Sequence, residues 1–441
     1  MNELVLYEGP SVHALHPAGI QYTPHCGLLF SEKTGRIIYH GEFQKAMEQA
    51  SKATVVRIPE GCVLFPGLVD THTHLPQYGV AGRYDVELLE WLEKYVFPVE
   101  ASFEDSELAL RYSEKFILDL VKGGTTTASI FTTIHKEATD IAFQAAERIG
   151  LRALIGKVMM DVNCPESLRE DAESAITNSE RLYNRWNNRA NGRLKYSFTP
   201  RFALTSSKKL LNKTGEIVAK YNAHLQTHLS ETKQEVRMVH ESFPNYASYT
   251  DLYSRSGLLT KNAIFAHSIY LSSDEIRTIG LSGAGIAHCP SSNLFLRSGF
   301  FKTRLFMNSG INVGLGSDIG AGPELSMLRT MALAGYSSKA AMIARGAQHG
   351  RYSVYSLTPG EAFYLSTMGG AKALGMDNEI GNFEIGKKAD FLVLDVSGVD
   401  PLSRGINELD LSSILALMMY RGSDQAVKET YVDGKRVYTI L

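Results

Sequence analysis

The central part of the chain alternates short apolar runs with longer stretches that repeat apolar residues at helical spacing. The apolar runs are of strand length, and the longer stretches, such as 106–122 and 208–221, predict amphipathic helices. The strands expected from these runs are 68–72, 125–131, 153–160, 194–199, 224–228, 263–267, 285–288 and 313–317. Eight strands separated by helices are typical of an α/β fold, the (β/α)₈ TIM barrel. A doubly wound parallel sheet remains the alternative.

Both ends of the chain have a different pattern, in which short apolar runs alternate with turn-forming residues. Short strands are expected at 4–7, 26–30 and 36–39, bounded by turn formers such as Gly9-Pro10, and again at 389–395 and 429–438, the last as a hairpin with an Asp-Gly turn. We expect the two ends to pair into one small β-sandwich domain. The predicted organisation is therefore residues 1–65 and 376–441 for the β-sandwich and residues 66–375 for the barrel.

Composition narrows the function classes. The 441 residues are 44% hydrophobic and 21% charged, with a formal net charge of −2, so nothing favours a nucleic-acid or acidic-membrane partner. Four scattered cysteines without a CxxC pair indicate reduced thiols, as in the cytoplasm. We see no signal-peptide pattern, and no apolar run approaches the roughly 18 residues of a membrane span.

Candidate chemistry gathers where the predicted strands end. His72 and His74 share one strand face because side chains alternate along a strand. Three further strands end at His228, His267 and Asp318. In a barrel these carboxyl ends meet at one face, and imidazoles with a carboxylate suit Zn²⁺, with Fe²⁺ also possible.

A carboxylate also stands beside this group. Glu231 follows His228 by three residues, at the point where the chain leaves the strand. We expect it to transfer protons rather than to bind the metal.

The motifs around these residues resemble those of the metal-dependent amidohydrolase superfamily. They extend over nearly the whole chain and comprise PGLVDTHTH at 66–74, GGTTT at 123–127, HLSE at 228–231, AHCPSSN at 287–293, GLGSD at 314–318 and GKKADF at 386–391. Within the superfamily, four shorter stretches are similar to those of guanine deaminases: 77–78, 89–92, 156–161 and 199–202.

This resemblance implies a set of roles for single residues. His72, His74, His228 and Asp318 would bind one Zn²⁺ per chain, while Glu231, His267 and Asp318 would be catalytic. The substrate would contact seven side chains: Gln77, Trp91, Arg201, Phe202, His228, Glu231 and His267. No lysine ends the fourth strand, where binuclear relatives carry one, and Lys195 stands at the wrong end of it; we therefore expect a single metal.

The implied reaction is the hydrolytic deamination of guanine to xanthine and ammonia by a metal-activated water, in a homodimer. Arg201 and the amide of Gln77 can pair with a carbonyl oxygen and a ring nitrogen, and Phe202 and Trp91 offer flat faces for a purine.

The sequence leaves several alternatives open. The substrate could be a different purine, a pyrimidine or an s-triazine, or the chain could be a barrel protein that has lost catalysis. Gln77 could cap a loop, Trp91 and His267 could be core residues, and Arg201 could form a structural ion pair. His288 is expected to be structural, and Lys387-Lys388 to be a solvated turn.

Overall fold

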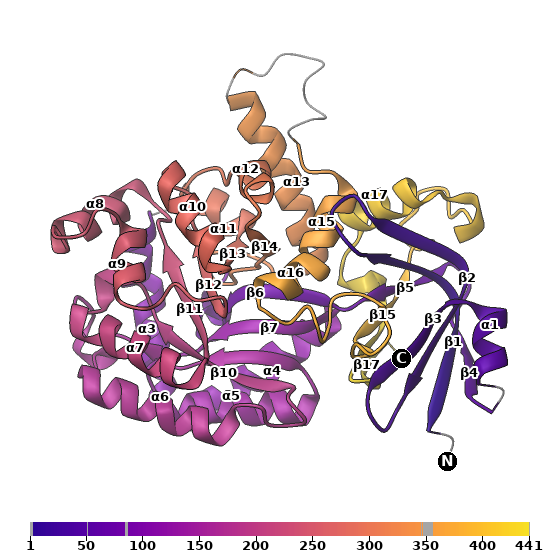
Figure 1. Ribbon diagram of the computed structural model, residues 1–441, viewed down its shortest axis with the longest axis horizontal. Helices are drawn as coiled ribbons and strands as arrows, with labels where there is room; N and C mark the ends of the chain where they lie inside the picture. Colours follow the sequence, from indigo (N-terminus) through magenta and orange to yellow (C-terminus); the bar gives the residue numbers. More distant parts are fainter. Residues whose placement is uncertain (1–2, 51, 84–86, 345, 347–355, 441) are drawn as a thin grey trace.

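The computed structural model describes residues 3–50, 52–83, 87–344, 346 and 356–440. They form a barrel and a separate sheet, which lie side by side, with both ends of the chain in the sheet (Figure 1). The helices are α1 (Phe43–Gln49), α2 (Leu88–Trp91), α3 (Phe97–Ala101), α4 (Ser106–Lys122), α5 (Lys136–Ile149), α6 (Ala172–Trp186), α7 (Lys208–Tyr221), α8 (Lys233–Ser242), α9 (Tyr249–Arg255), α10 (Ser273–Ser282), α11 (Pro290–Phe295), α12 (Thr303–Asn308), α13 (Met327–Ala344), α15 (Pro359–Leu365), α16 (Met368–Ala373) and α17 (Leu411–Arg421).

The terminal sheet joins the two ends of the chain as expected. Its order is β17-β16-β15-β5-β1-β2-β3, with β4 also paired to β1. The strands are β1 (Leu4–Ala14), β2 (Ile20–Ser31), β3 (Arg36–Glu42), β4 (Thr54–Arg57), β5 (Cys62–Pro66), β15 (Phe391–Asp395), β16 (Val427–Val432) and β17 (Lys435–Thr439). The sheet folds onto itself, because the Tyr7 ring on β1 lies 5.1 Å from Phe391 and 5.4 Å from Tyr431, on strands that are not its neighbours. This arrangement confirms the β-sandwich.

Gly9-Pro10 is not a turn, contrary to the expectation. It lies inside β1, where the pairing with β2 shifts register between Gly9 and Ser11. The extra residue of this bulge is on β2, because Pro10 alone separates Gly9 from Ser11, whereas two residues separate their partners Cys26 and Thr23. Proline is tolerated where the ladder is interrupted in this way. Two turn-forming residues therefore bend one long strand instead of separating two short ones.

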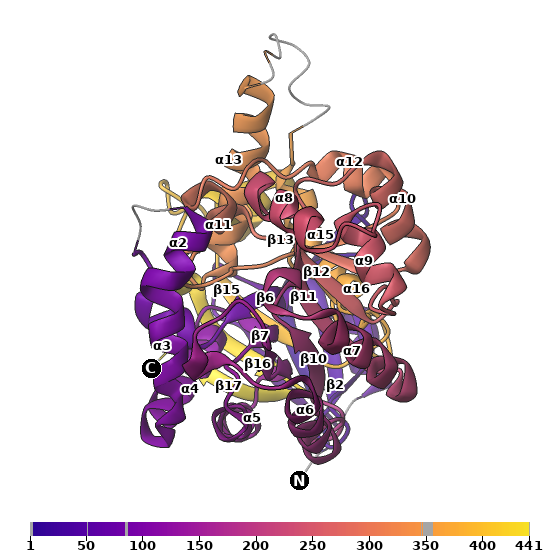
Figure 2. The ribbon, with the colours of Figure 1, turned by 90° about the vertical axis from the view of Figure 1, so that its left-hand side faces the viewer.

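The barrel contains the eight parallel strands in the order β6, β7, β8, β10, β11, β12, β13, β14. Its strands are β6 (Leu68–His74), β7 (Thr125–Phe131), β8 (Arg152–Gly156), β9 (Val158–Met159), β10 (Leu194–Pro200), β11 (His224–Leu229), β12 (Ala263–His267), β13 (Gly285–His288) and β14 (Asn312–Leu315). The expected third strand, 153–160, is divided at Lys157 into β8 and β9, which both pair with β10. Figure 2 shows the helices arranged around these strands.

The first and last strands meet and bring two site residues together. Thr71 Oγ1 on β6 donates to the Leu315 carbonyl on β14 at 2.8 Å, and the Asp318 amide donates to the His72 carbonyl at 2.9 Å. These bonds connect the two edges of the parallel sheet, so the barrel expected from the sequence is confirmed. Asp318 and His72, which are far apart in the sequence, are thereby neighbours.

Buried charges connect the barrel to the sheet. Arg152 on β8 is fully buried and donates to Asp390 at 2.8 Å and to Asp433 at 2.5 Å. Lys388 lies 3.4 Å from the same Asp433 and Lys387 2.7 Å from Glu384, and both lysines are buried. The expectation of a solvated turn at 387–388 is therefore wrong, because this segment lies against β3, where Ile37 pairs with the Lys387 carbonyl.

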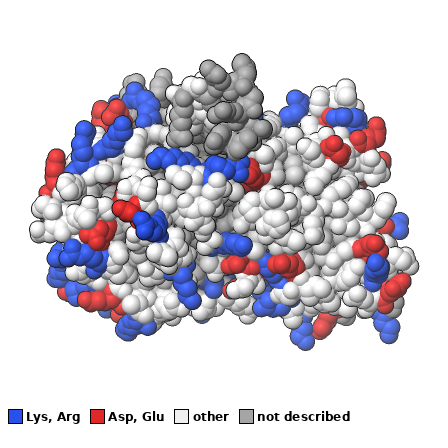
Figure 3. All heavy atoms as spheres, turned by 45° about the horizontal axis from the view of Figure 1, so that its top comes forward, with Lys and Arg blue, Asp and Glu red and all other residues white. Residues whose placement is uncertain are grey.

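The surface carries both signs of charge. On the face shown in Figure 3, basic and acidic side chains of the described residues are interspersed among uncharged ones. Among the helices of the described residues, none combines the length and the apolar character needed to cross a bilayer.

Candidate active site

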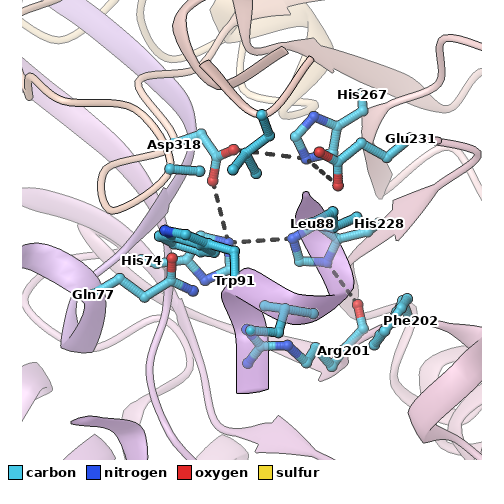
Figure 4. Close-up of a pocket in the computed structure, with 13 residues that line it drawn as sticks. His74, Gln77, Leu88, Trp91, Arg201, Phe202, His228, Glu231, His267 and Asp318 are labelled. Atoms are coloured by element: carbon cyan, nitrogen blue, oxygen red, sulfur yellow. Dashed lines mark hydrogen bonds and ion pairs between the residues drawn. The ribbon is translucent and has the colours of Figure 1, made fainter. Parts of the chain in front are cut away.

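The predicted chemical residues converge at the carboxyl ends of four barrel strands (Figure 4). His72 and His74 end β6, His228 lies near the end of β11, His267 ends β12, and Asp318 follows β14. All five are buried or nearly so. The alternation of strand side chains and the closing of the barrel therefore bring together all the residues expected at this face.

Four candidate ligand atoms lie close together at this face. The Nε2 atom of His74 lies 3.1 Å from Nε2 of His72, 3.2 Å from Nε2 of His228 and 3.4 Å from Oδ1 of Asp318. The His72 Nε2 to Asp318 Oδ1 distance is 3.3 Å. Ligands at Zn–N and Zn–O distances in a tetrahedron are separated by roughly 3.3 Å. His72, His74 and His228 therefore form a candidate set for one ion, and Asp318 lies at such a distance from His72 and His74.

The protonation of the histidines also suits a cation. Burial lowers the pKa of His72, and it lowers those of His74 and His228 well below the usual value, so these imidazoles are neutral. His228 Nδ1 donates to the Arg201 carbonyl at 2.7 Å, which leaves a lone pair on Nε2. The pKa of Asp318 is well below its usual range, since its histidine neighbours outweigh the effect of burial, and it supplies the negative charge.

The backbone at these strand ends adopts unusual conformations. Ser230, His267 and Asp318 have φ values of +50°, +67° and +48°. Left-handed backbone is uncommon for residues other than glycine and costs of order 1–3 kcal/mol per residue. Three such residues in one site show that packing holds the chain there against local preference.

Glu231 and His267 lie close together beside the candidate ligand atoms. Glu231 Oε2 lies 3.6 Å from His267 Nε2, which is also 3.7 Å from Asp318 Oδ2. Burial raises the pKa of Glu231, and the carboxylates of Glu231 and Asp318 raise that of His267 against the opposing effect of burial. A carboxyl group whose pKa is raised by burial can hold and release a proton near neutral pH.

Several residues that orient this pair were not identified from the sequence. Ser298 donates to Glu231 Oε1 at 2.8 Å, and His267 Nδ1 pairs with Asn293 Oδ1 at 2.9 Å. The Glu235 carboxylate accepts from the Glu231 amide at 2.7 Å as part of the capping box of α8. The capping pattern Thr232-x-x-Glu235 was visible in the sequence, whereas nothing marked Ser298.

Asp70 is a second residue that was not identified from the sequence. It is fully buried behind His72 and accepts from the Ser317 amide at 3.0 Å and the Ser317 hydroxyl at 2.5 Å. Burial raises its pKa to about 7. Because it bonds both to β6, at the His72 amide, and to the residue before Asp318, it fixes the relative position of two ligand residues.

A pocket opens beside these candidate ligand atoms. Its lining contains every substrate-contact residue expected from the sequence. The lining residues are His74, Gln77, Leu88, Trp91, Leu92, Arg201, Phe202, His228, Glu231, His267, Leu296, Asp318 and Ala321.

Two aromatic side chains, Trp91 and Phe202, offer apolar surface to the pocket. Trp91 Nε1 donates to the Arg83 carbonyl at 2.7 Å, so the indole presents its apolar ring to the pocket. Phe202 is buried, with its ring 6.4 Å from that of His228. A flat aromatic molecule in the pocket would therefore make apolar contacts close to the candidate metal-binding atoms.

Arg201 makes the ion pair that was the alternative to substrate contact, and it also lines the pocket. Its Nη1 lies 2.8 Å and 2.7 Å from the two oxygens of Glu100 on α3, and both side chains are buried. Glu100 was not identified from the sequence; the only signal was a glutamate after the apolar run 95–99.

His288 is outside this arrangement, as expected. Its ring stacks on Phe301 at 4.4 Å, and burial lowers its pKa to about 3. Lys195 lies 3.6 Å from Glu379, away from the strand ends. The buried Lys157, which divides β8 from β9, forms an ion pair with Glu170 and does not line the pocket.

Comparison with known proteins identifies the family of this chain. The model of the amidohydrolase family matches residues 63–437, and the chain belongs to this family. A guanine deaminase of Escherichia coli (strain K12) is 41% identical over 409 residues, which cover 92% of this chain and 90% of the relative.

Two solved structures are also similar. The guanine deaminase from C. acetobutylicum with guanine bound in its active site superposes with a TM-score of 0.91 at 31% identity, covering 99% of this chain and all of that one. An adenosine deaminase from Xanthomonas campestris with bound zinc has a TM-score of 0.83 at 25% identity, covering 98% and 92% of the two chains.

Proposed function

We propose that this chain is a guanine deaminase, which hydrolyses guanine to xanthine and ammonia. The observation that best supports this function is that the candidate metal-binding residues and the candidate purine-binding residues line the same pocket. The four-atom ligand set with Glu231 lies at the bottom of a pocket whose wall presents Arg201 and Gln77 to a flat ligand. The guanine deaminase relatives, one of them with guanine in its active site, support the same substrate.

The residues that would hold the metal are His72, His74, His228 and Asp318, and the ion would be Zn²⁺, which one relative binds. The same donor types also accept Fe²⁺. A bound Zn²⁺ supplies a water that ionises near pH 7. The neutral histidines and the ionised Asp318 need lose no proton to accept such an ion.

Glu231 would carry the protons of the reaction. It takes one proton from the attacking water and delivers it to N3 of guanine as C2 becomes tetrahedral. It then takes the proton of the new C2 hydroxyl and delivers it to the amino group, which leaves as ammonia while the C2 carbonyl forms. Its buried environment and the hydroxyl of Ser298 hold it in place for both transfers. One water is consumed and one ammonia leaves, so the proton count balances.

His267 and Asp318 would orient the water and stabilise the charge that develops at C2. His267 Nε2 lies between the carboxylates of Glu231 and Asp318, and Asn293 fixes its ring. Groups that are already oriented need no rearrangement during the reaction, which is the largest source of transition-state stabilisation in many enzymes.

Recognition of the base would rest on Gln77, Arg201, Phe202 and Trp91, with His228 in contact at the pocket floor. Arg201 donates to the C6 carbonyl oxygen, and the two aromatic rings enclose the purine. Adenine has an amino group at C6, which would face the guanidinium donor to donor and leave it unpaired.

The alternative within the family is an aminohydrolase with another substrate, such as adenine, cytosine or an s-triazine. The decisive assay is ammonia release by the zinc-loaded enzyme from guanine and from each of these bases, with xanthine identified as the guanine product. Selective turnover of guanine is expected. Turnover of another base with none of guanine would overturn the proposal, and no turnover at full metal content would favour a non-catalytic barrel.

The assembly and location are part of the proposal. We expect a homodimer in the cytoplasm, since the resemblance to guanine deaminases implies a dimer and the four cysteines are free thiols. Light scattering on the purified enzyme measures the assembly directly; a monomer at micromolar concentration would refute the dimer.

A further inference from the structure

We infer that Glu100 is a positioning residue that sets which pocket atoms donate and which accept, and so restricts the substrates to 2-aminopurines with a carbonyl at C6. The inference rests on the proposed function. Glu100 lies on α3, in the segment between β6 and α4, and is completely buried. It does not line the pocket, but it contacts two side chains that do.

The first contact fixes the donor. Both carboxylate oxygens of Glu100 bind the same nitrogen of Arg201, Nη1, at 2.8 Å and 2.7 Å. The Phe97 ring, 5.5 Å from the guanidinium carbon, packs against the same group. For Nη2 and Nε the described residues provide no hydrogen-bond acceptor, so these donors remain for a ligand. Because the guanidinium is planar, holding one nitrogen fixes the plane in which the others donate.

The second contact fixes the acceptor. Glu100 Oε1 lies 3.3 Å from Nε2 of Gln77. A carboxylate only accepts, so the amino end of the amide must face it and the oxygen must point away. That oxygen lies beside Gly320, where an added Cβ would approach it to 2.5 Å, and Figure 4 shows it on the side of Asp318. Glu100 thus gives Gln77 a carbonyl oxygen as its pocket atom.

Together the two contacts produce one donor next to one acceptor. The N1–H and C6 carbonyl of guanine match this pair: N1–H donates to Gln77 Oε1, and the carbonyl accepts from Arg201. In 2,6-diaminopurine both polarities are reversed, because N1 accepts and the C6 amino group donates. The amino group at C2, which would react, is present in both bases, and their intrinsic difference in reactivity is the same for every variant. A change in the ratio of the two rates between variants therefore reports the edge at N1 and C6.

The experiment compares guanine and 2,6-diaminopurine with wild type and Glu100→Gln, both loaded with zinc. A glutamine at position 100 cancels the charge and can donate as well as accept, so it no longer dictates the orientation of Gln77. We expect kcat/KM for guanine to fall at least tenfold, mainly through KM, and the guanine preference to narrow at least tenfold. Glu104→Gln, an exposed change of the same kind four residues on, should leave the preference unchanged.

The preference separates positioning from a merely structural role. If Glu100 only neutralised a buried arginine, Glu100→Gln would lower stability while each folded active site kept its wild-type preference, and the inference would be wrong. Glu100→Asp retains the charge with a shorter reach and should narrow the preference by a smaller factor. If Glu100→Gln does not fold, an unchanged preference in Glu100→Asp would refute the inference equally. Absence of guanine turnover in wild type would refute the proposed function instead, whereas an active wild type and unchanged preference would refute only this inference.

Discussion

Replacing Arg201 by alanine should damage stability and catalysis by two separable routes. Glu100 is completely buried and Arg201 is 2% exposed, so the truncation leaves a carboxylate in the interior without its cation. Breaking a buried pair in this way typically costs about 3–5 kcal/mol. Loss of the donor to the substrate carbonyl should remove about 1–3 kcal/mol of transition-state binding, or roughly fivefold to 150-fold in kcat/KM.

The double variant Arg201→Ala/Glu100→Gln separates the routes. A buried amide without a full set of partners costs about 1–3 kcal/mol, which is less than an unpaired carboxylate. The double variant should therefore be more stable than Arg201→Ala by roughly 2 kcal/mol. Its kcat/KM for guanine should remain low, because the donor is still missing.

The assay is urea unfolding of each variant together with steady-state xanthine formation per folded, metal-loaded active site. Arg148→Ala provides the control, since Arg148 and Glu114 form a pair whose side chains are 56% and 47% exposed. Exposed pairs contribute about 0–1 kcal/mol. If the double variant regained wild-type turnover, Arg201 would be a structural residue without a substrate contact. Equal stability of the single and double variants would show that the buried pair has no energetic coupling.

Three other measurements test the metal, the proton carrier and a buried histidine. Wild type should hold one zinc per chain by elemental analysis and Asp318→Ala markedly less; two tightly held ions per chain would contradict a single site. Glu231→Gln should lower kcat about 10²–10⁴-fold with metal retained, since Ser298 keeps an acceptor, and loss of the ion would instead make Glu231 a ligand. Burial lowers the pKa of His288 to about 3, so the unfolded chain, titrating near 6.5, takes up the proton first. The stability contributed by neutral His288 is complete above pH 6.5 and falls by up to about 1.4 kcal/mol per pH unit down to pH 3. The urea midpoints at pH 7 and pH 5 should therefore differ more for wild type than for His288→Phe. Equal differences in the two proteins would refute a lowered pKa of His288.

The elements of the barrel were largely predictable because local signals agree with tertiary packing. Helix α4 begins and ends as expected at 106–122, since Asp105 caps it and Gly123 ends it. Gly124 then has φ +82° and lies against Leu392, so it directs the chain into β7. Such agreement between a cap, a stop and an apolar face leaves one interpretation of the segment.

The errors arose where pairing with other segments overrides local residue preference. Gly9-Pro10 has the composition of a turn, but pairing with β2 on both sides keeps it inside β1, opposite a bulge of β2. Lys387-Lys388 has the composition of an exposed turn, but the segment is covered by the opposite end of the chain. The partner of Gly9-Pro10 is the next strand, whereas the partner of Lys387-Lys388 is β3 at the other end of the chain. In both cases the outcome depends on pairing, which residue composition does not reveal.

The residues of the candidate site also fall into those that the sequence identified and those that it did not. His72, His74, His228, His267 and Asp318 could be identified because each stands at the end of an apolar strand, and barrel topology alone makes strand ends meet. Glu100, Ser298 and Asn293 belong to segments without such a rule, and their roles depend on which side chain they face. Their contacts are not readable from spacing.

Chemistry and selectivity are therefore carried by different parts of this fold. The proposed ligand atoms and the proposed proton carrier come from the carboxyl ends of barrel strands or from residues that follow them directly. The segment between β6 and α4, which the barrel does not need for closure, contains Gln77, Trp91 and Glu100. Arg201 is the link, because it follows β10 directly and is paired to this segment through Glu100. A change of substrate within this architecture would consequently require changes in this segment and at Arg201 together, since altering either alone leaves a buried charge without its partner.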